Sequence, residues 1–292
     1  MKITLTALCC AVLVACGGVP IPQPIVMVGA GDIAGCATSG DEATAKLIED
    51  VIKQYPEASV FTLGDNVYQN ATAQEFSDCY TPNWGSFKTR TYPVAGNHDY
   101  LTANAAGYFG YYGTKAGDPS KGYYSYDLGA WHIVVVNSNC AAIGGCQAGS
   151  NQEKWLRDDL TANKSQCEIL MWHHARFSSG ADHGNNNFMQ DIWKAASDNQ
   201  VDLVLTAHDH TYERFAAMNA DGLADVNGIT EFVVGSGGFS HDALGVQKPN
   251  SMIFNADTYG VLQLELFASS YNFKFLSEAG KSFTDSGSGV CH

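Results

Sequence analysis

The stretch of sequence that decides the fold is Val60-Phe61-Thr62-Leu63-Gly64-Asp65-Asn66-Val67-Tyr68, residues 60–68. Four residues that favour β-structure lead directly into a glycine, a carboxylate, an amide and a phenol. The first part predicts a buried strand, and the second part supplies side chains that bind metal ions. Because open α/β sheets collect ligands at the carboxyl ends of their strands, the stretch predicts one part of a metal site.

The same pattern occurs at four other places in the chain. Each is an apolar run before Asp, Asn or His: Ile25-Val26-Met27-Val28 before Gly31-Asp32, Tyr92-Pro93-Val94-Ala95 before Gly96-Asn97-His98-Asp99, Ile169-Leu170-Met171-Trp172 before His173-His174, and Val201-Asp202-Leu203-Val204-Leu205 before His208-Asp209-His210. Two metal ions about 3.5–4 Å apart hold a phosphate between them and generate a nucleophilic hydroxide. Five such blocks in series therefore predict a hydrolytic two-metal site.

Size and charge narrow the class of protein. A chain of 292 residues with 45% apolar composition is long enough for one large globular domain. Thirty acidic residues against sixteen basic ones give a formal charge of −14. Because there is no run of Lys or Arg, the sequence predicts no nucleic-acid partner.

The first residues have the pattern of an export signal. Met1-Lys2 precedes an apolar run, residues 3–14, that is too short to span a membrane. Leu13-Val14-Ala15-Cys16 resembles the bacterial lipobox, in which the chain is cleaved before the cysteine and lipid is attached to its thiol; an ordinary secretory signal is the alternative. We expect a lipoprotein signal peptide (1–15), a tether (16–24) and a single domain (25–292). The protein is then anchored in the bacterial cell envelope through lipid on Cys16, facing the periplasm or the exterior.

Export changes how the cysteines are interpreted. Beyond the signal and Cys16 six remain: Cys36, Cys79, Cys140, Cys146, Cys167 and Cys291. An even set in an oxidising compartment predicts disulfides. The first pair that we assign is Cys140–Cys146, because these residues flank a small loop, and Cys36–Cys79 and Cys167–Cys291 are assigned by elimination. Thiolate metal ligation is the rival, but no Cys-x-x-Cys spacing occurs among the six.

Helical and strand patterns alternate and then give way to strands. Apolar spacing predicts a helix over residues 41–55, a second after the Ser150–Glu153 capping-box pattern, and a third over 188–196. Residues 122–128 and 131–137 predict a hairpin, and the part beyond residue 211 predicts strands at 231–234, 259–267 and 271–275. This order predicts a mixed α/β (α+β) fold, a two-sheet β-sandwich flanked by helices.

The ordered blocks resemble those of the calcineurin-like metallophosphoesterases. The motifs are Gly31-Asp32, Gly64-Asp65-x-x-Tyr68, Gly96-Asn97-His98-Asp99, His173 and His208-x-His210, and the resemblance extends over residues 25–275. Within that family the chain is similar to the purple acid phosphatase branch. Most members carry a His two residues after the first Asp, where this chain has Ala34, and Tyr68 is typical of the purple branch. A phenol with a pKa of about 10 needs a strong Lewis acid to become a ligand, which favours a trivalent ion.

The resemblance implies a role for each of these positions. Fe(III) would be held by Asp32, Asp65, Tyr68 and His210, with Asp65 bridging to a second site completed by Asn97, His173 and His208. The second ion would be divalent Fe, Zn or Mn. His98 would face the leaving-group oxygen as general acid or phosphate donor, oriented by Asp99. Two departures from the family pattern are Ala207 in place of Gly and Ala175 in place of Pro, and the second removes a restraint from the loop that follows.

Several of these residues have simpler interpretations when taken singly. Asp32 alone is a turn residue, and Tyr68 alone is a core residue. His132 is assigned to a strand and His174 to an outer or surface position, while His183 and His241 are left open between surface and substrate roles.

The resulting expectation is a binuclear metal-dependent phosphoric monoester hydrolase, resembling an acid phosphatase, in which a metal-bound hydroxide attacks a small phosphate ester. A phosphodiesterase or nucleotidase on the same scaffold is the alternative, and a non-catalytic surface binding protein is the alternative from another class. The sequence does not indicate the oligomeric state.

Overall fold

A computed structural model describes residues 23–292 of the chain. The expected signal peptide, residues 1–15, and the expected lipid site at Cys16 lie outside the described residues, as does most of the tether. Among the described residues, no helix has both the length and the apolar character needed to cross a membrane.

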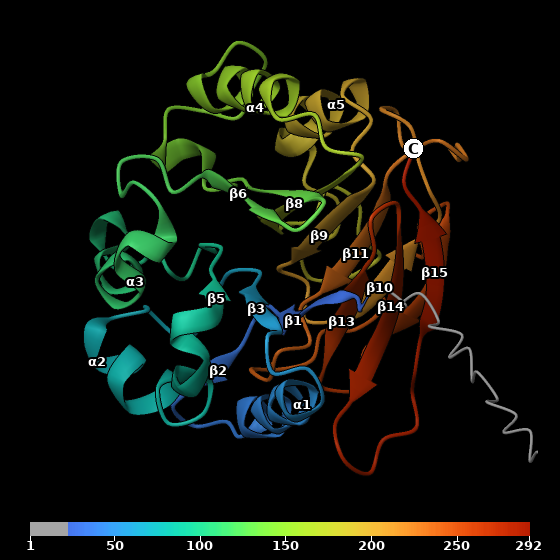
Figure 1. Cartoon of the computed structure of the whole chain (residues 1–292). Helices are drawn as coiled ribbons and strands as arrows, with labels where there is room; N and C mark the ends of the chain where they lie inside the picture. The colour runs from blue at the N-terminus through green and yellow to red at the C-terminus, as the bar shows by residue number, and fades with distance from the viewer. Residues whose placement is uncertain (1–22) are drawn as a thin grey trace, which may run out of the picture.

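Two mixed sheets lie face to face at the centre of the molecule (Figure 1). One has six strands in the order β15 (Ser286–Val290), β14 (Ser270–Ser277), β13 (Gly260–Leu266), β1 (Ile25–Ala30), β3 (Ser59–Thr62) and β5 (Thr91–Tyr92). The other has seven in the order β12 (Ser251–Asn255), β10 (Tyr212–Phe215), β11 (Thr230–Val234), β9 (Leu203–Ala207), β8 (Cys167–His174), β7 (Trp131–Val135) and β6 (Tyr124–Leu128). A separate parallel pair is formed by β2 (Ala34–Gly35), which follows β1 in the chain, and β4 (Val67–Tyr68), which follows β3.

The α-helices of the described residues are α1 (Gly40–Gln54), α2 (Ala73–Glu75), α3 (Ala106–Tyr112), α4 (Asn151–Ala162) and α5 (Gln190–Asp198). Figure 1 shows α1 on the side of the six-stranded sheet and α4 with α5 on the side of the seven-stranded sheet. The predicted two-sheet sandwich flanked by helices is therefore confirmed. Ser150 caps α4 as expected, but the Glu153 carboxylate accepts from the Gly149 amide rather than from Ser150.

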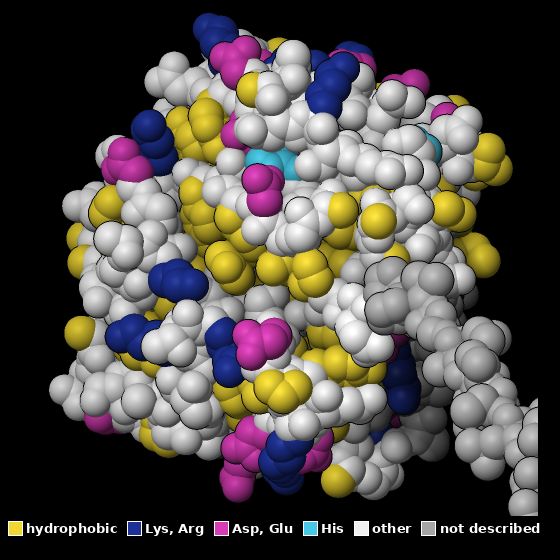
Figure 2. Space-filling view, viewed as in Figure 1, with side chains coloured by type: hydrophobic (Ala, Val, Ile, Leu, Met, Phe, Trp, Pro, Cys, Tyr) yellow, Lys and Arg dark blue, Asp and Glu magenta, His cyan; other side chains and the backbone are white. Residues whose placement is uncertain are grey.

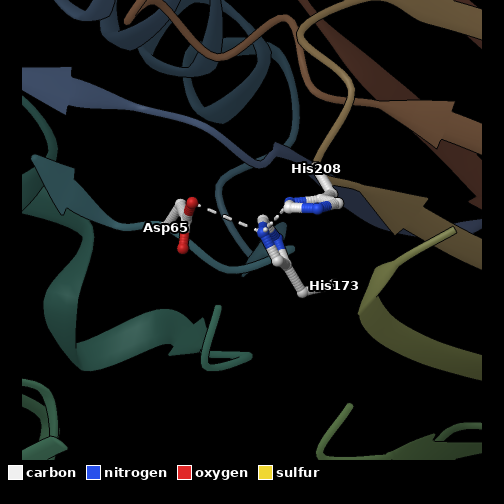
Figure 3. Close-up of side chains that lie close together, drawn as sticks. All are labelled: Asp65, His173 and His208. Carbon is white, nitrogen blue, oxygen red and sulfur yellow. Dashed lines mark hydrogen bonds and ion pairs between the residues drawn. The ribbon is translucent and has the colours of Figure 1, made fainter. Parts of the chain in front are cut away.

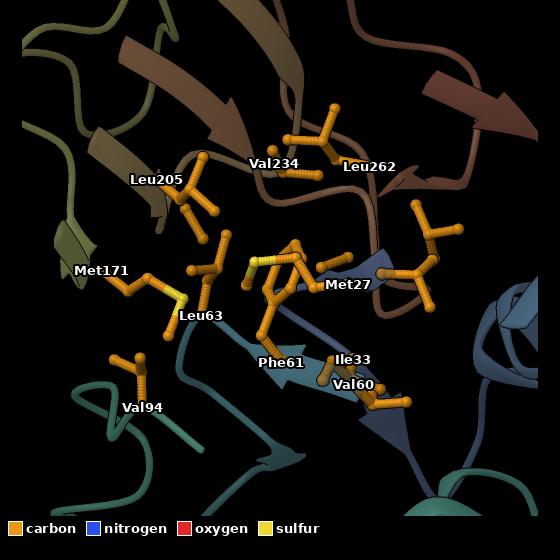
Figure 4. Close-up of a cluster of buried hydrophobic side chains, with 14 of the residues drawn as sticks. Met27, Ile33, Val60, Phe61, Leu63, Val94, Met171, Leu205, Val234 and Leu262 are labelled. Atoms are coloured by element: carbon orange, nitrogen blue, oxygen red, sulfur yellow. The ribbon is translucent and has the colours of Figure 1, made fainter. Parts of the chain in front are cut away.

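Side-chain alternation along the strands explains the layers. Because successive side chains of a strand point to opposite faces, Ile133 and Met171 pack into the core between the sheets, while Leu170 packs on the opposite face with residues of α4 and α5. Figure 4 shows the inner core, to which Met171 of one sheet and Met27 of the other both contribute. The seven-stranded sheet is thus buried on both faces, as the uninterrupted apolar run before His173 requires.

Parallel pairing brings the polar strand ends to one edge. β1, β3 and β5 are parallel neighbours in one sheet, and β7, β8, β9 and β11 are parallel neighbours in the other.

Two strand boundaries differ from those expected from the sequence. β5 ends at Tyr92, because Pro93 has no N–H to continue the ladder. His173 and His174 are the last two residues of β8 and do not follow it.

Three disulfides join the chain in the expected pairs. They are Cys36–Cys79, Cys140–Cys146 and Cys167–Cys291. The third connects β8 to the residue that follows β15, so it links the two sheets across a sequence separation of 124 residues. Disulfides of this kind fit a protein of an oxidising compartment, which agrees with the expected export.

Loop length gives the disulfides different energetic weights. In the chain-entropy account, the Cys167–Cys291 disulfide closes a loop with a sequence separation of 124 and stabilises the folded state by about 5 kcal/mol. The Cys140–Cys146 disulfide closes a loop with a separation of 6 and stabilises it by about 2 kcal/mol. We expect the Cys167→Ser/Cys291→Ser variant to lose more free energy of unfolding in denaturant titrations than Cys140→Ser/Cys146→Ser. Equal losses, or a larger loss for the short loop, would contradict this ranking.

Candidate metal centre

The backbone at three strand ends is in the left-handed region. Among the described residues, eight non-glycine residues have positive φ, and three of them are predicted ligands: Asp32 (58°), Asp65 (49°) and His208 (77°). Side chains disfavour this region, and such residues concentrate at functional sites. The reversal at each strand end turns the side chain toward the gap between the sheets.

Small residues make room for these turns. A Cβ on Gly96 would lie 2.1 Å from the Asp65 carboxylate, so only glycine fits there. A Cβ on Gly31 would lie 2.6 Å from the Cβ of Ala207. Ala207 replaces the usual glycine before His208, and the missing side chain of Gly31 opposite accommodates it.

Four of the predicted ligands form a first donor set. The Tyr68 hydroxyl oxygen lies 2.8 Å from Asp32 Oδ1, 3.0 Å from Asp65 Oδ2 and 3.1 Å from His210 Nε2. Tyr68 and both aspartates are almost fully buried. These four residues are the set that the resemblance assigns to Fe(III).

Asp65 also belongs to a second donor set, which Figure 3 shows in part. Its Oδ2 lies 3.4 Å from His173 Nε2, and that nitrogen lies 3.1 Å from Asn97 Oδ1 and 3.2 Å from His208 Nδ1. Asp65, His173 and His208 together offer three donor atoms within 4.8 Å of one another. All seven predicted ligand residues therefore come together, and Asp65 is common to both sets.

Outer contacts turn two of the imidazoles toward the donor sets. His173 Nδ1 lies 2.7 Å from the carbonyl oxygen of Leu63, and His210 Nδ1 lies 2.5 Å from Ser240 Oγ. A carbonyl oxygen only accepts hydrogen bonds, so His173 carries its proton on Nδ1. In the neutral imidazole, Nε2 then keeps the lone pair that a metal-ligating histidine uses, and this nitrogen is directed toward Asp65 and Asn97.

The buried acidic groups of the two donor sets would be stabilised by bound cations. Burial raises the pKa of Asp32 well above its usual range, and the nearby charge of Asp65 adds to the effect. Burial and the charges of Asp32 and Asp65 also raise the pKa of the Tyr68 phenol. Two carboxylates, a phenol and several imidazoles thus face one another. Burial lowers the pKa of His173, but the charge of Asp65 outweighs this effect and raises that pKa to about 9, so the site attracts positive charge. Oxygen and nitrogen donors arranged in this way fit metal ions, and these residues would hold them.

His98 lies beside Asp65, but its imidazole contacts the Gln69 carbonyl instead of the expected Asp99. Its amide donates to Asp65 Oδ1 (2.8 Å), its Nδ1 lies 2.6 Å from the Gln69 carbonyl, and its Nε2 lies 4.0 Å from Asp65 Oδ2. Asp99 instead accepts from the Gly96 amide and from Asn66 Nδ2 (2.8 and 2.9 Å). The expectation that Asp99 orients His98 is therefore wrong, because adjacent residues of this turn point in opposite directions.

The remaining histidines have separate surroundings. The exposed His183 stacks on the ring of His208, with centroids 3.8 Å apart and planes at 26°. His174 is buried, its Nδ1 lies 2.7 Å from Ser138 Oγ, and burial lowers its pKa to about 3. The exposed His241 stacks on Tyr259, and His132 lies in β7 between Asp127 and Asp159. His174 also packs on the ring of His208, with centroids 4.3 Å apart, so both His183 and His174 border the donor sets. The sequence position of His183, ten residues after His173, does not by itself reveal its contact.

A sequence reading alone does not find two further contacts at the site. Phe239 stacks on the Tyr68 ring with centroids 3.6 Å apart and planes at 7°. The loop that carries Phe239 also brings Asp242, whose carboxylate accepts from the His210 amide at 2.7 Å. A Gly-rich run before Phe239 is the only sequence feature that indicates a close approach of this loop.

Comparison with known proteins supports the motif-based expectation. Residues 27–212 match the family model described as calcineurin-like phosphoesterase. Purple acid phosphatase 22 of Arabidopsis thaliana is 27% identical over 213 residues, which cover 63% of this chain and 48% of that protein. An uncharacterized protein of Mycobacterium tuberculosis is 25% identical over 226 residues, covering 63% and 43%. The chain spans about half the length of the curated relatives it matches.

Solved structures confirm the fold. Purple acid phosphatase PPD1 from yellow lupin (Lupinus luteus) seeds has a TM-score of 0.68 at 18% identity, covering 90% of this chain and 53% of that one. GAP50, described as the anchor in the inner membrane complex of Plasmodium, has a TM-score of 0.67 at 16% identity, covering 90% and 88%. Together with the matched relatives, these findings confirm the resemblance to the purple acid phosphatase branch.

Metal binding has a measurable consequence for stability. A divalent ion at about 100 times its dissociation constant stabilises the folded state by about 2.7 kcal/mol, which raises the melting temperature of a chain this size by roughly 5–10 °C. We expect this rise when Zn²⁺ or Mn²⁺ is added to metal-stripped protein, and we expect Asp65→Asn to abolish it, because both donor sets share that carboxylate. The exposed Asp118→Asn variant is the control, and a rise that survives in Asp65→Asn would contradict the assignment.

Proposed function

The chain belongs to the calcineurin-like phosphoesterase family, and on that premise we propose that it is a metal-dependent hydrolase of small phosphate monoesters. The observation that carries the proposal is the shared carboxylate, Asp65, which belongs to two donor sets at once. A phosphate ester needs two adjacent cations to hold its oxygens, and a common carboxylate is what keeps two cations adjacent.

The proposed cofactor is Fe(III) in the first donor set with a divalent Fe, Zn or Mn ion in the second. Tyr68 supports this assignment, because its phenol lies between Asp32 and Asp65, and both negative charges disfavour its ionisation. A phenol in that position would become a ligand only when a strong Lewis acid binds its oxygen and so lowers its pKa enough for the proton to pass to water. When bound, the two ions supply the Lewis acidity and the activated water that the hydrolysis requires.

The chain's own residues bind and orient the substrate. His98 is partly exposed, with its Nδ1 held by the Gln69 carbonyl, so that its Nε2 is left for the phosphate or the leaving-group oxygen. His183, stacked on His208 at the other donor set, is placed for a hydrogen bond to a phosphate oxygen. In this arrangement His98 delivers a proton to the departing alkoxide, and His183 holds the phosphoryl group in line.

The site is proposed to act outside the cytoplasm. Three disulfides support an oxidising compartment, and the lipobox-like Leu13-Val14-Ala15-Cys16 supports a lipid anchor in the bacterial cell envelope. On the face of the molecule in Figure 2, basic and acidic side chains are interspersed. The formal charge of −14 for the whole chain supports small phosphate esters rather than nucleic acid as substrates.

Two alternatives are separable from this proposal. A phosphodiesterase or nucleotidase would use the same donor sets, and only the substrate distinguishes it. A non-catalytic surface protein is the alternative from another class, and the similarity in fold to GAP50, whose description is that of an anchor, makes it a case to test.

An absorption spectrum tests the proposed iron. Iron-loaded protein should be coloured by a tyrosinate-to-Fe(III) charge-transfer band, and Tyr68→Phe should lose that band while it keeps the fold. Tyr92→Phe, which removes a hydroxyl from a tyrosine stacked on Tyr126, is the matched control and should stay coloured. A colourless iron-loaded protein would disprove the purple-type centre and leave the wider family assignment intact.

Substrate turnover tests the reaction and the role of His98. We expect p-nitrophenyl phosphate to be hydrolysed faster than bis(p-nitrophenyl) phosphate, with the reverse order favouring the phosphodiesterase. His98→Ala should lower kcat by roughly 10²–10⁴-fold, the contribution of one general acid, while His292→Ala serves as a matched histidine control. If Asp65→Asn and His98→Ala both hydrolyse the monoester at the normal rate in metal-replete samples, the catalytic proposal fails.

A further inference from the structure

The loop that carries His183 leaves the end of β8 and crosses the strands of the seven-stranded sheet. It runs over residues 175–184, between the ligand His173 and the short turn before α5. Ala175 at its start replaces the proline of the family pattern, and the resulting expectation was a less restrained loop. The structure shows instead that the backbone amides of this loop are held by three buried carboxylates.

Glu231 holds the first part of the loop. It is fully buried in β11, its Oε1 accepts from the Arg176 amide, and its Oε2 accepts from the Phe177 amide, both at 3.1 Å. Burial raises the pKa of Glu231 to about 8. Both Glu231 oxygens thus accept hydrogen bonds from the amides of the two residues that directly follow Ala175. These hydrogen bonds restrain the backbone of the loop where the family pattern has a proline.

Glu213 and Asp209 hold the rest of the loop. Glu213 Oε2 accepts from the Ser179 amide at 2.8 Å, and Glu213 Oε1 has no partner among the described residues. Asp209 Oδ1 accepts from the His183 amide at 3.1 Å, and Asp209 Oδ2 accepts from the Gly184 amide at 3.0 Å. The residue that carries the imidazole is therefore itself bound to Asp209.

The approach of Asp209 to the loop is close enough to require a glycine. A Cβ on Gly180 would lie 2.1 Å from Asp209 Oδ1. Asp209 and Glu213 are, like Glu231, 0% exposed. Burying three acidic side chains is a costly way to fasten a loop, since apolar packing would do so without desolvating polar groups. Hydrogen bonds to amides are, however, directional, so they fix where a backbone lies.

We propose that Asp209, Glu213 and Glu231 are positioning residues that fix the 175–184 loop and thereby place the His183 imidazole against His208, where it binds a phosphate oxygen of the substrate. The inference rests on the proposed function, because it needs a phosphate at the metal centre. It goes beyond that function by assigning the geometry of the substrate contact to three acids that touch neither substrate nor metal.

The number of oxygens through which each carboxylate accepts hydrogen bonds predicts how strongly its substitution affects the loop. Glu213→Gln keeps a carbonyl oxygen for the Ser179 amide, so it should weaken the hold on the loop less than Asp209→Asn does. Asp209→Asn necessarily turns an NH₂ toward either the His183 or the Gly184 amide, so it should release the loop. Gly180→Ala should have the same effect without changing a residue that lies between two metal ligands.

Hydrogen exchange tests the anchoring without any metal or substrate. In Asp209→Asn and Gly180→Ala the amides of residues 183 and 184 should exchange at least tenfold faster than in the wild type, and in Glu213→Gln the loop should lose less protection than in these two variants. Asp285→Asn, which removes a buried carboxylate paired with Arg214 and not with the loop, is the control. Unchanged loop protection in both loop variants would overturn the proposal.

Binding of inorganic phosphate to the metal-loaded protein tests the link to His183. Calorimetry should show roughly tenfold weaker binding in Asp209→Asn, the effect of losing one charge-assisted hydrogen bond, with metal content by elemental analysis unchanged. In a His183→Ala background the same substitution should have no further effect. Equal losses in both backgrounds, or loss of metal, would overturn the positioning role. A wild-type protein that binds metal but no phosphate would instead disprove the proposed function itself.

Discussion

The constraint on which the rest of the structure depends is the burial of two carboxylates, Asp32 and Asp65, on either side of the Tyr68 phenol. Each aspartate uses one oxygen to accept a backbone amide, from His208 and from His98 respectively. The other oxygen of each faces lone pairs and the phenol, where it cannot be stabilised by any described positive side chain other than protonated histidine. Without cations this arrangement costs free energy, and bound cations would offset that cost.

The two-sheet architecture follows from that constraint. Donors from five strand ends can meet only if two parallel sets of strands point at the same gap, one in each sheet. Asp32 and Asp65 come from β1 and β3 of one sheet, whereas His173 comes from β8 of the other. The apolar core between the sheets keeps those strand ends at a fixed separation, and the left-handed turns at Asp32, Asp65 and His208 aim the side chains across it.

Sequence patterns predict the part of this site that strand topology determines. Every predicted ligand reaches the site, because a polar residue directly after a buried strand has only one edge of the sheet to occupy. The patterns fail where side-chain direction within a turn decides, as at Asp99, which turns to Asn66 and Gly96 rather than to His98. They also give no indication of Glu231, which in sequence is one polar residue in an apolar strand, because its partners are backbone amides 55 and 54 residues away.

Aspartate side chains have two different proposed roles near His208, and the hydrogen-bond partners of each carboxylate oxygen distinguish them. Both Asp209 oxygens accept from N–H donors, so its charge is already satisfied and it needs no cation. Asp65 Oδ2 accepts from the Tyr68 hydroxyl and lies 3.4 Å from an imidazole nitrogen of His173 instead. A carboxylate whose two oxygens are both saturated by amides needs no cation, whereas one that faces other ligand side chains is suited to a metal ion. By that criterion the acidic residues around His208 divide into those proposed to hold the ions and those proposed to hold the loop.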